Sequence, residues 1–375
     1  MVTWLLVAVS LGVAQARAQH TDGDDRIGPV RSVAALVETQ PVPSGGDAAD
    51  DAAIWIHDTD PRRARILGTD KQFGLVVYDL DGSAVQTIEG GRYNNVDLRY
   101  EFKLGDGTLV DVAAVSNRTD ASIAVYAIGR SSGVLRRAGQ IETGLDQVYG
   151  ICMYRSAKSG AFYVFVGDKG GATEQYRLEP EDVDGITGVL ARRFNVGSQT
   201  EGMAALDRAG VVFIGEENAG LWKYDAEPGP IEPGEGPERV LIDAIRPVGR
   251  LVNDVEGVTI WDQEDEGWGL VLVSAQDEDR FAVYGYENSA GGSISDPEYI
   301  CSFSVTGSSD GKIDAVSHTD GIDVVRGFGL ERFERGMLVV QDDENPGSTQ
   351  NFKLVSMDAV LKEVVAGSTA RFTRP

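Results

Sequence analysis

Polar or glycyl residues, in most copies acids or amides, recur at one place in this chain, the start of a short apolar segment. Six such segments follow one another: DDAAIWI from Asp50, NNVDLRY from Asn94, VYGICMY from Val148, TEGMAAL from Thr200, VEGVTIW from Val255 and TDGIDVV from Thr319. Carboxylates brought together cannot all stay ionised without counter-charge. Because sites rich in oxygen ligands favour hard cations, of which Ca²⁺ is the commonest outside the cell, converging acids would indicate a calcium site.

Cations occur at a second recurring place. Lys71, Arg118 and Lys169 each stand at the polar tip between two apolar segments, whereas the later tips are acidic, as at Glu217. Cationic side chains hold phosphoryl oxygens. A water molecule that bridges two metal ions is an efficient nucleophile for in-line attack on phosphorus. Three cations on one flank of an acidic, calcium-binding mouth therefore favour phosphate chemistry.

A repeated hairpin must position these groups. Each copy is an apolar segment, a polar tip and a second segment that ends in an aromatic, and successive aromatics lie 48 to 68 residues apart: Tyr78, Tyr126, Tyr176, Tyr224, Tyr284 and Phe352. Self-similarity of this period with β-type segments is typical of propeller blades. We expect an all-β, six-bladed β-propeller, with blades of about four antiparallel strands around a central channel. The acidic segments should be the inner strands, with glycine allowing close approach near the axis.

The repeat predicts a single domain over residues 33–375. The segment Ser32–Val42, SVAALVETQPV, is a candidate extra strand that closes the ring on the last blade. Residues 1–18 combine an apolar core with a small-x-small site at Ala16–Ala18, which is typical of a signal peptide. Residues 19–32 are polar, and we expect them to be disordered. The expected location is therefore secreted or periplasmic.

Composition excludes several partners. A net charge of −25 argues against nucleic acid, because phosphate-backbone binding relies on clustered Lys and Arg. Beyond the N-terminus, the sequence has no apolar stretch long enough to span a membrane. The same acidic excess favours a monomer. Cys152 and Cys301 have no metal-type spacing, and we expect two buried free thiols.

Residue motifs also exclude several hydrolase classes. The three histidines lack an Arg-His-Gly context, and neither cysteine is followed by Arg six residues later. The sequence contains neither a GxxxxGK[ST] phosphate loop nor a GxSxG elbow. A metal-activated water is the remaining nucleophile for a hydrolase.

Ten separated segments resemble the β-propeller (alkaline) phytases, in order, between about residues 37 and 352. They are GDAADDAAIWIHDTDP, LGTDKQFGLVVYDLDG, RYNNVDLRYEF, SNR, VYGICMY, SQTEGMAAL, GEENAGLWKYDAEP, NDVEGVTIW, TDGIDV and QNFKLV. The resemblance implies a 3-phytase-like phosphoric monoester hydrolase that uses several Ca²⁺ ions. It would cut phytate, myo-inositol hexakisphosphate, to lower inositol phosphates and orthophosphate by direct attack of a metal-bridged water.

The resemblance also implies residue roles. For catalysis it implies Lys71, Arg118, Tyr149, Glu201, Glu217, Glu256 and Asp323. For substrate binding it implies Lys71, Arg118 and Tyr149 at the cleaved phosphate and Lys169 beside it. As metal ligands or groups that orient water it implies Glu38, Asp51, Glu201, Glu217, Asp254, Glu256 and Asp323, with Asp47, Asp97, Asp320 and Asn351 as further ligands.

Three positions depart from the family pattern. Gln72 stands where a second Lys is frequent, Gly170 where an acid is frequent, and His318 where an Asp is common. These changes affect the neighbouring-phosphate site and one calcium ligand.

Two other functions fit the same architecture. One is a propeller lactonase with one metal in the channel, although a neutral lactone does not explain the three cations. The other is a non-catalytic propeller that binds calcium, glycans or partner proteins.

Overall fold

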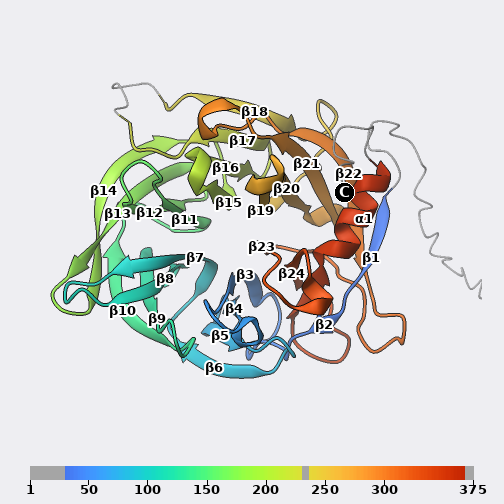
Figure 1. Ribbon diagram of the computed structural model, residues 1–375, viewed down its shortest axis with the longest axis horizontal. Helices are drawn as coiled ribbons and strands as arrows, with labels where there is room; N and C mark the ends of the chain where they lie inside the picture. The colour runs from blue at the N-terminus through green and yellow to red at the C-terminus, as the bar shows by residue number, and fades with distance from the viewer. Residues whose placement is uncertain (1–29, 230–235, 368–375) are drawn as a thin grey trace, which may run out of the picture.

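Six small sheets surround a central channel (Figure 1). The computed structural model describes residues 30–229 and 236–367. Each sheet contains four antiparallel strands, and one of them gains a fifth, parallel strand. The expectation of an all-β, six-bladed propeller is confirmed. The expected signal peptide, residues 1–18, and the expected disordered residues 19–29 lie outside the described residues.

The first three blades run outward from the channel in chain order. Their strands are β3 (Ala49–Trp55), β4 (Arg65–Asp70), β5 (Gly74–Tyr78) and β6 (Ala84–Glu89); β7 (Tyr93–Lys103), β8 (Leu109–Asn117), β9 (Ser122–Ile128) and β10 (Leu135–Glu142); and β11 (Ile151–Arg155), β12 (Phe162–Gly167), β13 (Ala172–Glu181) and β14 (Gly185–Asn195). In each blade the acidic or amide segment supplies the innermost strand, as the sequence predicts.

The last three blades repeat this order, and the chain then ends in a helix. Their strands are β15 (Thr200–Leu206), β16 (Val211–Glu216), β17 (Gly220–Asp225) and β18 (Arg239–Ala244); β19 (Val255–Gln263), β20 (Trp268–Ala275), β21 (Arg280–Glu287) and β22 (Glu298–Thr306); and β23 (Ile322–Arg326), β24 (Gly336–Asp342) and β25 (Asn351–Ser356), followed by α1 (Met357–Gly367). Within residues 30–229 and 236–367, no helix is long and apolar enough to cross a membrane.

The N-terminal segment closes the ring. Strand β2 (Val37–Glu38) pairs antiparallel with β25 and completes the sixth blade. Strand β1 (Arg31–Ala34) pairs in parallel with β22, so it adds a fifth strand to the neighbouring blade. The expected extra strand is therefore confirmed, and the segment serves two blades rather than one. Arg31 and Ser32 belong to this strand, within the segment expected to be disordered.

The repeated aromatics form part of the packing between blades. Tyr78 and Phe352 meet in one buried cluster, with ring centroids 6.2 Å apart. All six repeated aromatics are buried, with at most 5% of their surface exposed. Each aromatic packs between neighbouring sheets. The regular spacing of these aromatics in the sequence therefore reflects the need of each blade for one large side chain at this contact. Cys152 and Cys301 are free and buried, as expected.

Glycines let the inner strands crowd around the axis. A Cβ atom on Gly202 would lie 1.8 Å from the carbonyl oxygen of Glu256, and one on Gly257 would lie 2.7 Å from that of Asp320. The Gly257 amide donates to that same Asp320 carbonyl at 2.8 Å. Glycine is therefore required where one blade's inner strand meets the next.

Blade six contains a buried ion-pair cluster. Lys353 on β25 is 0% exposed, and its Nζ lies 2.6 Å from the Oδ2 of Asp342, which is also 0% exposed. The same ammonium contacts the carboxylate of Asp314 and donates to the backbone carbonyls of Asp314 and Ala315. This cluster ties β25 to β24 and to the loop before β23.

The Lys353 cluster predicts a large loss of stability on truncation. Lys353→Met removes the ammonium and leaves two carboxylates facing each other in a dry site, which should cost about 3–5 kcal/mol of unfolding free energy. Urea unfolding measures this value. The exposed Lys312→Met variant, the matched control, should stay within about 0.5 kcal/mol of the parent. A loss below about 1 kcal/mol for Lys353→Met would contradict a stabilising role.

Candidate functional site

Inner-strand starts and hairpin tips meet at one end of the channel, which we call the upper mouth. Ala49 at the start of β3 pairs with Asp70 at the end of β4, and Thr200 pairs with Glu216 in the same way. The register shifts just inside four of these starts, between Ala49 and Ala52, Tyr93 and Val96, Thr200 and Met203, and Val255 and Val258. Such bulges re-aim side chains, and they contain Asp50, Asp51, Asn94, Glu201 and Glu256.

Three glutamates converge at the upper mouth. Glu201, Glu217 and Glu256 each offer a carboxylate oxygen, and these oxygens all lie within 4.8 Å of one another. Each residue is at most 6% exposed. Glu217 Oε1 and Glu256 Oε2 have no hydrogen-bond partner in the described structure. We call this group the glutamate cluster. Buried carboxylate oxygens without partners are costly unless a cation joins them, so the cluster can hold a metal ion.

The pKa values of the cluster reflect this crowding. Burial and the charge of Asp50 raise the pKa of Glu201 to about 8. Burial, reinforced by Glu201, raises the pKa of Glu256 well above its ordinary value, and burial also raises that of Glu217. Glu201 therefore retains its proton at neutral pH unless positive charge enters the cluster.

Lys71 is surrounded by carboxylates. Its Nζ lies 2.8 Å from Asp50 and 2.8 Å from Asp320, and 2.5 Å from the exposed Asp47. Burial alone would lower the pKa of Lys71, but the charges of Asp50 and Asp320 outweigh it and raise the pKa above its ordinary value. Lys71 stands at the tip between β4 and β5, and closure of the ring brings Asp320 of the sixth blade against it. The charge of this cation is therefore already balanced by acids.

The other two cations flank an aromatic ring. Arg118 Cζ lies 5.3 Å from the centroid of the Tyr149 ring, and Lys169 Nζ lies 4.2 Å from it. Burial and the charges of Glu201 and Asp50 raise the pKa of Tyr149, so its hydroxyl stays protonated. These three residues form a cationic rim with a neutral donor. We call them the Tyr149 rim.

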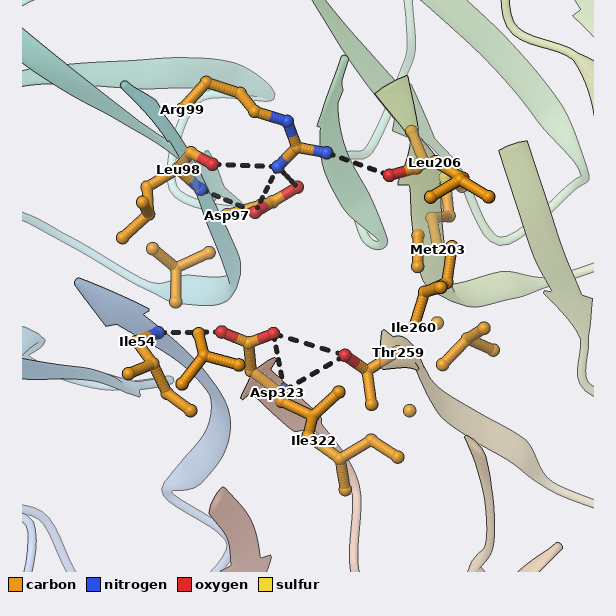
Figure 2. Close-up of a pocket in the computed structure, with 18 of the residues that line it drawn as sticks. Ile54, Asp97, Leu98, Arg99, Met203, Leu206, Thr259, Ile260, Ile322 and Asp323 are labelled. Carbon is orange, nitrogen blue, oxygen red and sulfur yellow. Dashed lines mark hydrogen bonds and ion pairs between the residues drawn. The ribbon is translucent and has the colours of Figure 1, made fainter. Parts of the chain in front are cut away.

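A second acidic group lies lower in the channel. Asp51, Asp97 and Asp323 line a cavity of about 480 Å³ that extends toward Arg99 and Asp207 (Figure 2). Asp323 accepts hydrogen bonds from the Ile54 amide at 2.7 Å and the Thr259 hydroxyl at 3.2 Å.

Burial raises the pKa of each of these three acids. For Asp323, burial and the charge of Asp97 together raise the pKa to about 7. The Asp97 carboxylate faces the Arg99 guanidinium at 3.0 Å (Figure 2). Asp323 was predicted with the catalytic acids, and Asp51 and Asp97 as metal ligands. The structure places all three at a separate level of the channel from the glutamate cluster.

The remaining predicted ligands lie in two further places. Asn351 Nδ2 lies 3.4 Å from Glu38 Oε2 across β25 and β2, and Asn351 Oδ1 is buried without a hydrogen-bond partner in the described structure. Asp254 adopts φ 58°, a left-handed conformation that non-glycine residues seldom adopt, directly before β19. The next amide, of Val255, donates to the Glu217 carbonyl at 3.4 Å, so Asp254 adjoins the glutamate cluster.

The three departures from the family pattern lie on the rim. The Gln72 side chain donates to the Gly45 carbonyl at 2.9 Å, Gly170 is exposed, and His318 lies 3.8 Å from Asp279. Two other acidic hairpin tips form ion pairs away from the glutamate cluster: Glu278 pairs with Arg246 and Arg280, and Asp342 pairs with Lys353. An acidic residue at a hairpin tip therefore does not by itself belong to the site.

Two site residues escaped assignment from the sequence. Asp50 contacts Lys71, and Asn94 contacts Asp50, Glu201 and Arg118. Both stand at the start of an inner strand, in the same position as Glu201. Their place in the repeat was the signal that could have identified them.

Fold and site together define a six-bladed β-propeller enzyme with a buried, metal-type carboxylate site beside a cationic rim. A family model described as phytase matches residues 3–368. The 3-phytase of Bacillus subtilis (strain 168) is 40% identical over 344 residues, which cover 88% of this chain and 85% of that protein. The chain belongs to the phytase family.

Two solved structures resemble the chain distantly. An auxiliary nutrient binding protein from Bacteroides thetaiotaomicron has a TM-score of 0.48 at 12% identity, over 86% of this chain and 75% of that one. Kluyveromyces lactis Hsv2 has a TM-score of 0.39 at 10% identity, over 69% and 74%. At these values neither likeness bears on fold or function.

The raised pKa of Glu201 predicts how the metal-free protein responds to pH. The folded protein holds this proton up to about pH 8, whereas the unfolded chain loses it near 4.5. The contribution of Glu201 to the free energy of unfolding therefore falls as the pH rises from about 4.5 to about 8. In chelator at pH 8, Glu201→Gln should melt a few degrees above the parent, with a smaller gain at pH 5.

Thermal melts at both pH values test this expectation. The exposed Glu331→Gln variant, the matched control, should melt with the parent at either pH. A lower melting temperature for Glu201→Gln at pH 8 would contradict charge repulsion in the cluster.

Proposed function

We propose that this protein is a calcium-dependent phytase that hydrolyses phosphomonoesters of phytate to lower inositol phosphates and orthophosphate. One observation carries the proposal. The glutamate cluster, with two buried oxygens that lack partners, shares the upper mouth with the Tyr149 rim. The name of the Bacillus subtilis relative, 3-phytase, supports phytate as the substrate.

The donor set fits calcium. The oxygens of Glu201, Glu217 and Glu256 are carboxylates, with no histidine or cysteine among them, and hard divalent cations prefer such ligands. Asp254 would extend this site. We infer further ion positions at Asp51, Asp97 and Asp323 and at Glu38 and Asn351, with Asp47 and Asp320 as rim ligands. Calcium there would supply positive charge and activate a water for in-line attack on phosphorus.

Charge balance explains why activity should require the metal. Phytate carries many negative charges, and an ionised glutamate cluster would repel it. Lys71 is already neutralised by its three carboxylates. Arg118 and Lys169 are then the cations available to a phosphoryl group, and two cations do not offset the acids. Calcium bound at these carboxylates would change the electrostatic potential of the upper mouth from negative to positive.

The side chains would then share the work of binding. Arg118 can grip phosphoryl oxygens in a fork, with Tyr149 donating a hydroxyl hydrogen bond. Lys169 would contact an adjacent phosphate. Lys71 would exchange a carboxylate for a phosphoryl oxygen once calcium takes up Asp50 or Asp320. Glu201, Glu217, Glu256 and Asp323 would orient the ions and the attacking water.

Phosphate release from phytate, measured with calcium and with EDTA, tests the proposal. We expect release only with calcium, and we expect EDTA to lower the melting temperature. A metal bound only by the folded state stabilises it by about 2.7 kcal/mol when its concentration is 100 times Kd. Calcium binding without release would favour a non-catalytic module, and hydrolysis of a lactone in place of phytate would favour a lactonase.

Two substitutions should remove activity. Glu217→Gln and Lys71→Ala should each lower kcat/KM at least about a hundredfold, because each removes a charge at the reacting centre. Glu331→Gln and Lys312→Ala are the matched surface controls, and both should retain parental rates. Parental activity in either Glu217→Gln or Lys71→Ala would overturn the assigned roles.

A further inference from the structure

Asn94 joins the acidic and cationic halves of the upper mouth. It stands in the bulge at the start of β7 and is 0% exposed. Its Nδ2 lies 2.7 Å from Asp50 Oδ2 and 2.7 Å from Glu201 Oε1. Its Oδ1 accepts a hydrogen bond from Arg118 Nη1 at 2.9 Å. One neutral side chain therefore contacts a carboxylate from blade one, a carboxylate from blade four and a guanidinium.

The chemistry of these partners sets the amide's orientation. A guanidinium only donates hydrogen bonds, so Oδ1 must face Arg118, and Nδ2 then faces Asp50 and Glu201. A carboxamide offers two donor hydrogens on one atom and a separate acceptor without adding charge. In a buried, already acidic site an added charge would be costly. The position therefore calls for asparagine on chemical grounds.

These contacts link the groups that must act together. Asp50 also pairs with Lys71 at 2.8 Å, and Arg118 also lies over the Tyr149 ring. Glu201 belongs to the glutamate cluster. An ion pair thus joins Lys71 to Asp50, and hydrogen bonds continue from Asp50 through Asn94 to Arg118, with a branch to Glu201.

We propose that Asn94 is a positioning residue that fixes the distance between the carboxylates that would hold calcium and the arginine that would hold phosphate. The inference rests on the proposed function, since it concerns the same site. Hydrogen-bond partners of ligating carboxylates typically change metal affinity or activity about 10- to 100-fold when removed. Asn94 should act on both halves of the site, because its amide contacts both.

Two substitutions of similar size distinguish the effect of Asn94 on the carboxylates from its effect on Arg118. Asn94→Asp keeps an acceptor for Arg118 but replaces the donor by a carboxylate that faces Asp50 and Glu201. Asn94→Leu removes both donor and acceptor. We expect both variants to need at least about tenfold more calcium for half-maximal thermal stabilisation. We expect Asn94→Leu also to raise the inhibition constant of inorganic phosphate about tenfold, because Arg118 loses its anchor.

Asn288→Asp is the matched control. Asn288 likewise accepts from an arginine, Arg208 at 2.7 Å, and its Nδ2 donates to the backbone carbonyl of Glu264 at 3.1 Å. It lies at the far end of its blade from the upper mouth and touches neither the glutamate cluster nor the Tyr149 rim. The same Asn-to-Asp change there should leave kcat, KM and calcium response within about twofold of the parent.

The decisive measurements are kcat and KM on phytate, phosphate inhibition, and calcium-dependent melting of the full chain. We expect kcat at least about tenfold lower in both Asn94 variants. Parental kcat and calcium response, even with a lower melting temperature in EDTA, would overturn the proposal and leave Asn94 a structural residue. If the parent releases no phosphate from phytate, the proposed function is wrong. The calcium dependence of the melting temperature then still tests whether Asn94 positions the carboxylates.

Discussion

Carboxylates crowded around the axis of a closed ring are the constraint on which this structure depends. Six inner strands begin at one mouth, and several begin with an acid, so negative charge accumulates in a volume with little water. Desolvation raises the pKa values of Glu201, Glu217 and Glu256 together. Lys71 and Asn94 offset part of this charge, and within the described residues Glu217 Oε1 and Glu256 Oε2 have no hydrogen-bond partner.

A comparison within the molecule shows why that last feature matters. Lys353 meets Asp342 and Asp314 in blade six, and this buried charge is balanced by the chain's own groups. The glutamate cluster has no such partner for Glu217 Oε1 or Glu256 Oε2 in the described residues. A balanced cluster stabilises the fold by itself, whereas an unbalanced one is stable only with a ligand. The upper mouth is of the second kind.

Backbone geometry makes this crowding possible. Bulges near the starts of four inner strands aim neighbouring side chains into the channel. Glycines such as Gly202 and Gly257 allow the next strand to approach within contact distance. The buried aromatics between blades hold the ring closed. The site is therefore a product of the ring, and each blade contributes a part that is incomplete alone.

The sequence by itself determined the repeat, and with it the six blades, the inner strands and the residue types at the mouth. These follow from short-range patterns: alternating apolar segments, a regular aromatic and glycine at crowded starts. Only the tertiary structure decided which charges meet. It set Lys71 among Asp47, Asp50 and Asp320, separated Asp323 from the glutamate cluster, and placed Asn94 between the two halves. Such partners lie up to 249 residues apart, and closure of the ring, which no local pattern encodes, brings them within hydrogen-bond distance.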